Sequence, residues 1–313
     1  EVIRDGDAIV ARTNFGRPKR IVIAGHIDTV PVADNLPIKM LSMEREQVLF
    51  GRGVVDMKAG VAVQLKLAAE LTDAHSDITW IFYDHEEVEA SKNGLGRLAR
   101  NSPELLKADF AILCEPTAAQ VEGGCNGTMR ADVRTRGVKA HSARSWMGAN
   151  AIHSAAAILN RLEAYEPAEV EVDGLVYREG MNAVLINGGI ATNVIPDECV
   201  VTVNYRFAPS KSAADAAAHI REVFEGFEVE IVDEAEGARP GLDRQEAIDF
   251  VAATGAEARP KYGWTDVARF SALGIPAVNY GPGDPSKAHA DDEALPVSQI
   301  YDCEAGLRNW LAV

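Results

Sequence analysis

Short apolar runs separated by a helix-forming stretch constrain the fold of this chain more than any other feature. Three runs are almost purely apolar, RIVIAG (20–25), ITWIFY (78–83) and FAILC (110–114). Each run suits a short strand that is buried on both faces of a sheet. Residues 57–71, between the first two runs, place Ala, Val and Leu at helical spacing. Strand, helix and strand in this order predict a doubly wound α/β layer.

After the two glycines at 123–124 the wholly apolar runs give way to stretches that alternate between apolar and polar residues, which indicates a second domain. A chain of 313 residues with 47% apolar composition is long enough for two cores. Alternating stretches there predict half-solvated antiparallel strands, and two further stretches predict helices. The strands are 128–136 and 199–207, and the helices are 150–165 and 213–224. We therefore predict an inserted α+β domain at 125–238, between the two parts of a discontinuous first domain, 1–124 and 239–313, whose last buried strand is 275–280.

Charge and composition exclude several classes of function. The formal net charge of −16 argues against a nucleic-acid or anionic-membrane surface, because both need clustered Lys and Arg. No apolar run approaches the roughly 20 residues of a membrane helix, so we expect a soluble cytoplasmic protein. The four cysteines lie far apart without a Cys-x-x-Cys pair, which indicates ordinary thiols.

Ionisable residues follow the predicted strands at the points where the strands end. His26 follows the first run, Glu86 and Glu87 follow the second, and Glu115 follows the third. The carboxyl ends of strands form the binding crevice of an open α/β sheet. Two more candidates complete the set: Asp56, which opens the predicted helix after a glycine-rich loop, and His289, in the loop after the last buried strand.

Each of these residues has an ordinary structural interpretation when it is taken singly. A histidine at a strand end is usually a satisfied polar residue, Asp56 could be a helix N-cap, and the glutamates could stand in solvated loops or turns. The set as a whole favours metal binding, because burying this many acids in one crevice without cations costs several kcal/mol per charge.

We predict two divalent cations per chain, about 3.5–4 Å apart. A mixed set of His and carboxylate ligands suits zinc, with cobalt or manganese as substitutes. Of Glu86 and Glu87, one would bind metal and the other would transfer protons. Asp28 could orient His26 through its other ring nitrogen or could form a turn, and its spacing does not choose between the two. This chemistry is that of amide hydrolysis.

Seven motifs in order resemble the M20 family of metallo-aminohydrolases and carboxypeptidases, nearly from end to end of the chain. They are GHIDTVP (25–31), GRGVVDMKAG (51–60), DHEEVEASKNGLG (84–96), CEPT (114–117), KAHSARSWMGANAI (139–152), ATNVIPDE (191–198) and KAHADDE (287–293). The resemblance implies a metallopeptidase-like catalytic domain and a ferredoxin-like lid and dimerisation domain. It implies that Asp56 bridges both metals, with His26 and Glu115 on one ion and Glu87 and His289 on the other. Glu86 would be the general base and Asp28 would orient His26.

The resemblance also implies residues in the inserted domain that act on the substrate. His141 would stabilise the oxyanion and would come from the neighbouring subunit of a homodimer. Asn193 and Arg206 would reach the substrate across the dimer, and Thr265 would line the pocket. Their ordinary interpretations are a polar residue at a strand end for His141 and an exposed strand cation for Arg206.

Three longer stretches are most similar to the actinobacterial branch of the family that comprises succinyl-diaminopimelate desuccinylases. They are 82–100, 121–153 and 261–284. The resemblance implies that the substrate is a small N-acyl diamino acid, N-succinyl-LL-2,6-diaminopimelate. Proteobacterial members carry basic residues where this chain has Cys125-Asn126. The residues that form their acyl pocket therefore cannot be assigned to positions of this chain. One or more of Arg130, Arg144 and Arg178 could compensate.

Other functions fit the same metal motif. Within the family these are acetylornithine deacetylase, an N-acyl-amino-acid hydrolase and a dipeptidase. Outside it are a metal-stabilised binding protein without activity, which should have lost the base or a ligand, and a hydrolase with a single metal. Only the acyl pocket would separate the enzymes from one another.

Overall fold

The computed structural model describes residues 1–43 and 46–313, and the chain in it forms two compact units. The first unit contains residues 1–124, 239–261 and 265–313. The second contains residues 125–238 and 262–264. Within the described part of the chain, no helix is long and apolar enough to span a bilayer. The cytoplasmic location stays a prediction.

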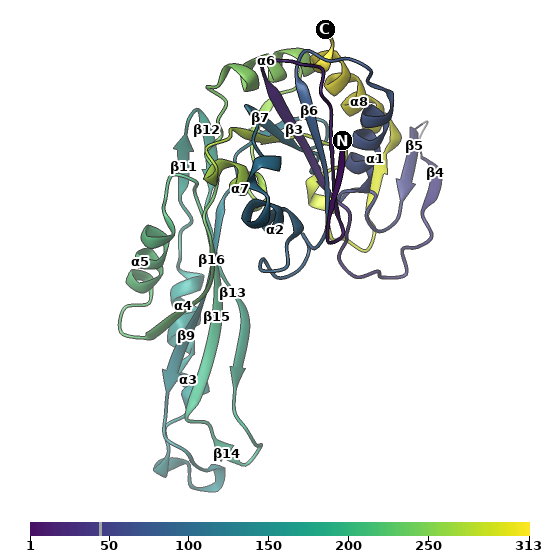
Figure 1. Cartoon of the computed structure of the whole chain (residues 1–313). Helices are drawn as coiled ribbons and strands as arrows, with labels where there is room; N and C mark the ends of the chain where they lie inside the picture. The colour runs from purple at the N-terminus through teal and green to yellow at the C-terminus, as the bar shows by residue number, and fades with distance from the viewer. Residues whose placement is uncertain (44–45) are drawn as a thin grey trace. The chain divides into compact units, whose positions relative to one another are not determined.

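An eight-stranded mixed sheet is the centre of the first unit (Figure 1). Its four middle strands, β6, β3, β7 and β18, run parallel, and the outer β1, β2 and β8 add antiparallel pairings. In spatial order the strands are β1 (Val2–Asp5), β2 (Ala8–Arg12), β6 (Asp77–Tyr83), β3 (Arg20–His26), β7 (Phe110–Leu113), β18 (Ala277–Asn279), β8 (Val121–Gly123) and β17 (Ala258–Pro260). The chain passes from β3 to β6 on one side and then to β7 on the other. The predicted doubly wound layer is confirmed, and the crossover point lies at β3.

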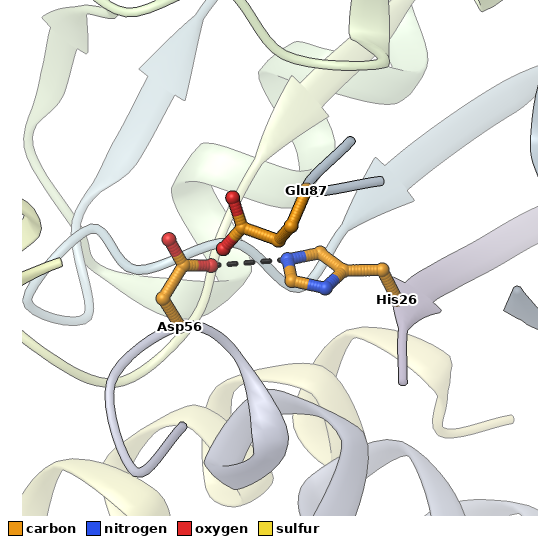
Figure 2. A group of neighbouring side chains, drawn as sticks. All are labelled: His26, Asp56 and Glu87. Atoms are coloured by element: carbon orange, nitrogen blue, oxygen red, sulfur yellow. Dashed lines mark hydrogen bonds and ion pairs between the residues drawn. The ribbon is translucent and has the colours of Figure 1, made fainter. Parts of the chain in front are cut away.

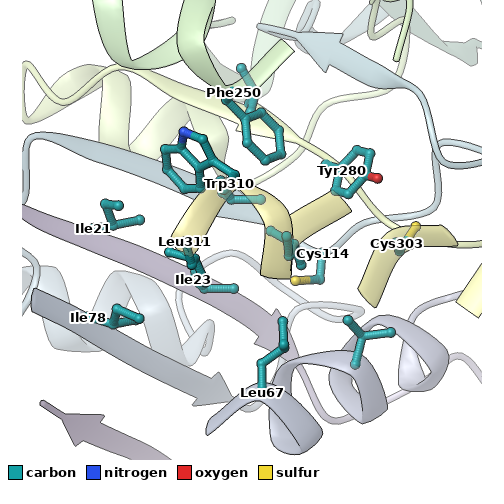
Figure 3. Close-up of a cluster of buried hydrophobic side chains, with 14 of the residues drawn as sticks. Ile21, Ile23, Leu67, Ile78, Cys114, Phe250, Tyr280, Cys303, Trp310 and Leu311 are labelled. Atoms are coloured by element: carbon teal, nitrogen blue, oxygen red, sulfur yellow. The ribbon is translucent and has the colours of Figure 1, made fainter. Parts of the chain in front are cut away.

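Helices cover both faces of this sheet. Ile21, Ile23 and Ile78 point toward the face covered by α1, α6 and α8, where they pack with Phe250 and Trp310 (Figure 3). Their neighbours along the strands are also buried, so each strand is apolar throughout. The helices of the unit are α1 (Lys58–Glu70), α2 (Gly94–Asn101), α6 (Gln245–Thr254), α7 (Val267–Ala272) and α8 (Val297–Leu311), with the 3-10 turns η1 (Pro103–Leu105) and η3 (Pro285–Lys287).

A small three-stranded antiparallel sheet joins two loops of the first unit. Its strands, in order, are β19 (Ala294–Pro296), β5 (Glu46–Phe50) and β4 (Lys39–Met43). Ala294 pairs with Phe50. Because the pairing is antiparallel, the segment that precedes β19 lies beside the segment that follows β5. These two segments carry His289 and Asp56.

The second unit has a four-stranded antiparallel sheet in the order β13 (Gly180–Gly188), β15 (Glu198–Phe207), β9 (Gly127–Arg136), β16 (Glu228–Ala235). Strands β9 and β15 alternate strictly between buried and partly exposed residues, and the buried face packs on the helices. The helices are α3 (Ala151–Ser154), α4 (Ala156–Glu163) and α5 (Ala213–Val223). The order of strands and helices is β-α-β-β-α-β, the connectivity of a ferredoxin-like fold.

Smaller elements complete the second unit. They are the strand pairs β10 (Ala140–His141) with β14 (Val194–Ile195) and β11 (Glu169–Val172) with β12 (Leu175–Arg178), and the 3-10 helix η2 (Ser142–Met147). The single helix predicted for 150–165 is two helices, which meet at Ala155. Asn150 caps the first, because its side chain accepts from the backbone N–H groups of Ile152 and His153.

Candidate metal centre

The predicted ligands gather at the carboxyl ends of the parallel strands. His26 is the last residue of β3, Glu86 and Glu87 lie in the loop after β6, and Glu115 follows β7. His289 lies in the loop that leads from β18 to β19. Parallel strands end at the same edge of a sheet, so residues far apart in the sequence meet there.

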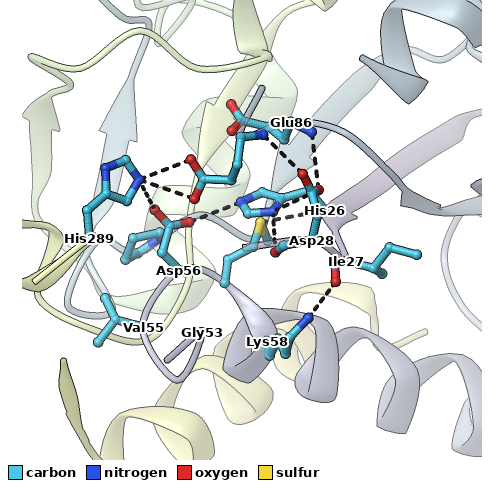
Figure 4. Close-up of polar contacts among 12 residues, drawn as sticks. His26, Ile27, Asp28, Gly53, Val55, Asp56, Lys58, Glu86 and His289 are labelled. Carbon is cyan, nitrogen blue, oxygen red and sulfur yellow. Dashed lines mark hydrogen bonds and ion pairs between the residues drawn. The ribbon is translucent and has the colours of Figure 1, made fainter. Parts of the chain in front are cut away.

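Asp56 stands between the two histidines (Figure 4). Its Oδ1 lies 3.0 Å from His26 Nε2, and its Oδ2 lies 3.4 Å from His289 Nε2. The N-cap interpretation of Asp56 is wrong, because Met57 occupies the N-cap position of α1 and no side chain caps the helix. The Asp56–Met57 peptide bond is cis. The two distances show that each carboxylate oxygen of Asp56 faces an imidazole, as a bridging ligand would require.

Glu87 joins this group from the loop after β6. Its Oε2 and Oε1 lie 3.1 and 3.2 Å from His289 Nε2. One potential ligand atom from each of His26, Asp56 and Glu87 lies within 4.8 Å of the others (Figure 2). A nitrogen and two carboxylate oxygens at this separation form a donor set of the kind that zinc takes.

Asp28 connects His26 to the loop that carries both glutamates. Its Oδ1 lies 3.6 Å from His26 Nδ1, and its backbone oxygen lies 3.2 Å from the same nitrogen. The Asp28 carboxylate also accepts hydrogen bonds from the backbone N–H groups of Glu86 and Glu87, at 3.1 Å each. The side chain thus holds the glutamate loop and lies beside the imidazole, whose Nδ1 is nearer to the Asp28 backbone oxygen.

Glu115 is buried, whereas Asp56, Glu86 and Glu87 are half-buried. Glu115 is 5% exposed, and its Oε1 is buried without a hydrogen-bond partner in the described part of the chain. Lys261, also buried, donates to the backbone oxygen of Pro116 at 3.0 Å and pairs with Glu122 at 2.8 Å. An unpartnered buried carboxylate oxygen is costly unless a cation binds it, so Glu115 fits the role of a metal ligand.

Burial and neighbouring charges raise the pKa values of several acids and imidazoles in the cluster. Burial and the charge of Asp56 raise the pKa of Glu115 to about 7. Burial, Glu115 and Asp266 raise the pKa of Glu86 well above its usual range. The hydrogen bond to Asp56 raises the pKa of His289 to about 9. Too many acids lie together for all of them to ionise without added positive charge.

Three residues that the sequence assigned to the substrate lie in the second unit. His141 ends β10 beside Asn193, whose backbone oxygen accepts from Ser142 N at 2.9 Å. The Nδ1 of His141 accepts from the backbone N–H of Ala143 at 3.1 Å. Arg206 lies on β15, and burial lowers its pKa. No ion pair of Arg206 is found among the residues that the structure describes. His141 and Asn193 are therefore brought together, while Arg206 stands apart on the sheet.

Two of the three candidate arginines for the acyl pocket already have carboxylate partners. Arg130 pairs with Asp233 at 2.7 Å, and Arg178 pairs with Glu169 at 3.0 Å. Arg144, in η2, is exposed and has no ion pair within residues 1–43 and 46–313. Thr265, which the family resemblance places in the lining of the substrate pocket, belongs to the first unit and is buried, and its hydroxyl lies 2.9 Å from Asn279 Oδ1.

Residues 22–312 match the family described as peptidase family M20/M25/M40. The chain belongs to this family. Over 313 residues it is 52% identical to a protein of Mycobacterium tuberculosis (strain CDC 1551 / Oshkosh) that is provisionally named succinyl-diaminopimelate desuccinylase DapE, covering 99% of this chain and 87% of the relative. It is 47% identical over 321 residues to the succinyl-diaminopimelate desuccinylase of Corynebacterium glutamicum, covering 100% of this chain and 86% of the relative.

Solved structures show that M20 peptidases share this fold. A tripeptidase of Staphylococcus aureus aligns with a TM-score of 0.75 at 22% identity, over 97% of this chain and 83% of its own. The Bacillus subtilis YXEP protein, described as a dinuclear metal-binding peptidase of the M20 family, aligns with a TM-score of 0.68 at 15% identity, over 99% of this chain and 86% of its own. At these identities the likeness concerns the fold alone.

Two buried carboxylates lie next to the centre: Glu293, for which the sequence predicted no role, and Asp266, which adjoins Thr265 in the loop that the family resemblance places at the pocket. Asp266 is fully buried, accepts from Asn93 at 2.9 Å and also pairs with Arg269. Glu293 is also fully buried and contacts the loop that carries Asp56. Glu293 ends one of the family motifs, so its motif was visible in the sequence. Its contact with a loop some 240 positions away was not.

Proposed function

We propose that the protein hydrolyses N-succinyl-LL-2,6-diaminopimelate to succinate and LL-2,6-diaminopimelate, a step in the biosynthesis of lysine and diaminopimelate. The observation that carries the proposal is identity over nearly the whole chain with two proteins that bear the name of this activity. The centre supports it, since two imidazoles and several carboxylates lie together at the sheet edge.

The proposed cofactor is a pair of divalent cations, zinc with cobalt or manganese as alternatives. Asp56 would bridge them, His26 and Glu115 would complete one site, and Glu87 and His289 the other. Two features of the chain fit this assignment: the buried unpartnered oxygen of Glu115, and the position of Asp56 between two imidazoles. When bound, such cations polarise a carbonyl group and favour the deprotonation of water.

Glu86 is the proposed general base and acid. It has no hydrogen bond through its carboxylate to a neighbouring side chain among the described residues, unlike Glu87, which contacts His289. Glu86 would accept a proton from water and return it to the leaving amine. Asp28 holds Glu86 in place through the backbone N–H and orients His26 through its ring.

His141 is the proposed donor to the oxyanion. Because its Nδ1 accepts from the Ala143 N–H, the proton of the neutral ring lies on Nε2. A ring held in this tautomer presents an N–H donor, which is the group that stabilises the negative oxygen of a tetrahedral intermediate. We assign the ring to the site of a neighbouring subunit, with Asn193 beside it.

Strand β13 is the proposed contact between the two subunits, and residues 125–238 are the proposed lid and dimerisation domain. β13 lies at one edge of its sheet, and its sequence, GMNAVLING, has no charged residue. Val184, Leu185 and Ile186 are 51%, 60% and 51% exposed. An uncharged apolar edge strand pairs readily with a second strand, and a twofold axis would bring two copies of β13 together.

Arg206 and Arg144 are the proposed groups for the substrate carboxylates. Arg130 and Arg178 are already neutralised by Asp233 and Glu169. A guanidinium group without a partner is free to form charge-assisted hydrogen bonds with a carboxylate. Arg144 lies three positions after His141 and is therefore our choice for the succinyl carboxylate. Thr265 stays a proposed pocket residue.

A turnover panel tests the proposal. The enzyme is assayed with added zinc or cobalt on succinyl-diaminopimelate, acetyl-diaminopimelate, acetylornithine and a dipeptide. We expect kcat/KM to be highest for the succinyl substrate, and Arg144→Ala to lower it for that substrate while leaving acetyl-diaminopimelate nearly unchanged. Equal or reversed rates for acetylornithine would instead assign the protein to deacetylation.

A further inference from the structure

A buried ion pair, Arg52 with Glu293, lies next to the candidate metal centre. Arg52 Nη1 lies 3.0 Å from Glu293 Oε2, and the side chains are 4% and 1% exposed. Neither residue is one of the proposed ligands. Burying two charges costs several kcal/mol per ion unless further hydrogen bonds satisfy them. The partners that satisfy this pair show what it does.

Glu293 binds the loop that leads into α1 at four points. Its Oε2 accepts from Arg52 and from Gly53 N at 2.9 Å. Its Oε1 accepts from the backbone N–H groups of Val55 and Asp56, at 2.8 and 3.1 Å. Gly53, Val55 and Asp56 form one turn of loop below the two histidines (Figure 4). The carboxylate therefore fixes the backbone from which the bridging side chain of Asp56 projects.

Arg52 binds two other segments, each next to a proposed ligand. Its Nε donates to the backbone oxygen of Pro31 at 3.1 Å, in the loop that follows His26. Its Nη1 donates to the backbone oxygen of Ala290 at 3.0 Å, and Ala290 directly follows His289. The planar fork of arginine reaches both carbonyl groups while it stays paired with Glu293.

We propose that the Arg52–Glu293 pair is a positioning device that sets the separation of Asp56 and His289, and so determines how tightly the second metal ion binds. The pair joins the three segments that carry His26, Asp56 and His289. The antiparallel pairing of β5 with β19 brings the segments of Asp56 and His289 together, and the ion pair then fixes their spacing. Groups that orient metal ligands in this way typically change metal affinity about 10- to 100-fold. The inference rests on the proposed metal roles and not on the identity of the amide substrate.

Glu293→Gln isolates this role because the amide keeps the shape of the carboxylate. Both carboxylate oxygens accept two hydrogen bonds each. Whichever way the glutamine amide is turned, its NH2 group faces two N–H donors, so one side of the loop is released. Glu179→Gln is the matched control: Glu179 is also 1% exposed and accepts from Tyr205 Oη, Ala208 N and Lys211 Nζ at 2.8, 2.8 and 2.7 Å in the second unit.

The experiment titrates the metal-free full chain of each variant with Co²⁺. Visible absorption reports the ligand geometry and calorimetry the two affinities, while urea unfolding of the metal-free proteins reports stability. We expect Glu293→Gln to bind its weaker Co²⁺ equivalent about 10- to 100-fold less tightly, with an altered spectrum. Glu179→Gln should lose stability and keep both affinities. Wild-type affinities and spectrum in Glu293→Gln would overturn the proposal.

A second variant keeps the test decisive if Glu293→Gln does not fold. Arg52→Lys keeps the charge but loses the fork that reaches Pro31 and Ala290, so we expect a weaker second Co²⁺ equivalent here too. Unchanged binding in Arg52→Lys would overturn the proposal on its own. Failure of the proposed function would look different, because wild-type protein would bind two Co²⁺ ions and still not hydrolyse the succinyl substrate.

Discussion

Gly60 packs the first turns of α1 directly against the end of β7, and Gly60→Ala tests how closely the metal centre depends on that contact. A Cβ atom at Gly60 would lie 2.2 Å from the carbonyl oxygen of Cys114 and 2.9 Å from its Cβ. Ordinary contacts are about 3.5 Å or longer, so the helix or the strand must move by roughly 1 Å. Alanine gains about 1 kcal/mol of helix propensity over glycine, and overpacking costs about 1–3 kcal/mol. Because the clash is with backbone, we place the cost at the upper end, for a net loss of about 2 kcal/mol.

Urea unfolding of the metal-free protein measures this loss, with Gly180→Ala as the control. A Cβ at Gly180 would meet no atom within 4 Å, so this substitution should change the free energy of unfolding little. Cys114 precedes Glu115, and Gly60 lies four positions after Asp56, so the same shift would separate two proposed ligands and weaken metal binding. Wild-type or greater stability in Gly60→Ala, with unchanged metal affinity, would refute the reasoning.

Three further predictions address the base, the assembly and the protons of the site. Glu86→Gln should keep the metal content of wild type by elemental analysis and lower kcat about 10²- to 10⁴-fold; full activity would remove Glu86 from the mechanism. Leu185→Lys should yield a monomer by light scattering, whereas Val176→Lys, at a comparably exposed position on β12, should stay dimeric; a dimeric Leu185→Lys would exclude β13. His289, with its pKa raised to about 9, is protonated near pH 7 and must lose that proton to bind metal. Metal affinity should therefore rise with pH up to about 9 and proton release should appear in calorimetry in two buffers; affinity that does not change with pH would contradict this.

The sequence predicted those parts of the fold that have a periodic or wholly apolar pattern. Strands β3, β6 and β7 were predicted because burial on both faces of the sheet leaves an uninterrupted apolar run. Helix α1 was predicted because its apolar residues recur at helical spacing. The antiparallel outer strands were not predicted. β1 has no fully buried residue and β2 has only two, and each strand covers only four or five positions, which is too short for a period to be recognised.

Some residues of the candidate site could likewise be predicted from the sequence, and others could not. Ligands at strand ends could be predicted, because the topology of an open sheet places those ends together whatever lies between them. The contacts of Glu293 and Asp266 could not be predicted, because their partners are 240 and 173 positions away, and a single acid in a loop resembles any solvated acid. Asp56, at the start of a predicted helix, could have been either a metal ligand or a helix N-cap. The position of Met57 as the N-cap of α1 excludes the second interpretation.

The two edges of the four-stranded sheet differ in charge, and this difference limits how many copies of the chain can join. β13 is uncharged, whereas β16 presents exposed Glu228, Glu230 and Glu234 along the opposite edge. A sheet with two pairing edges can add copies without end, as fibrils do. In the proposed dimer a second copy pairs through β13 and leaves the two β16 edges outside. Glu228 and Glu230 there pair with Arg136 and Arg134 of their own sheet, and a third copy pairing through its β16 would add further carboxylates beside them. If the proposed β13 dimer forms, growth through the sheet should stop at two, and a concentrated solution of the protein should hold closed pairs and no polymers.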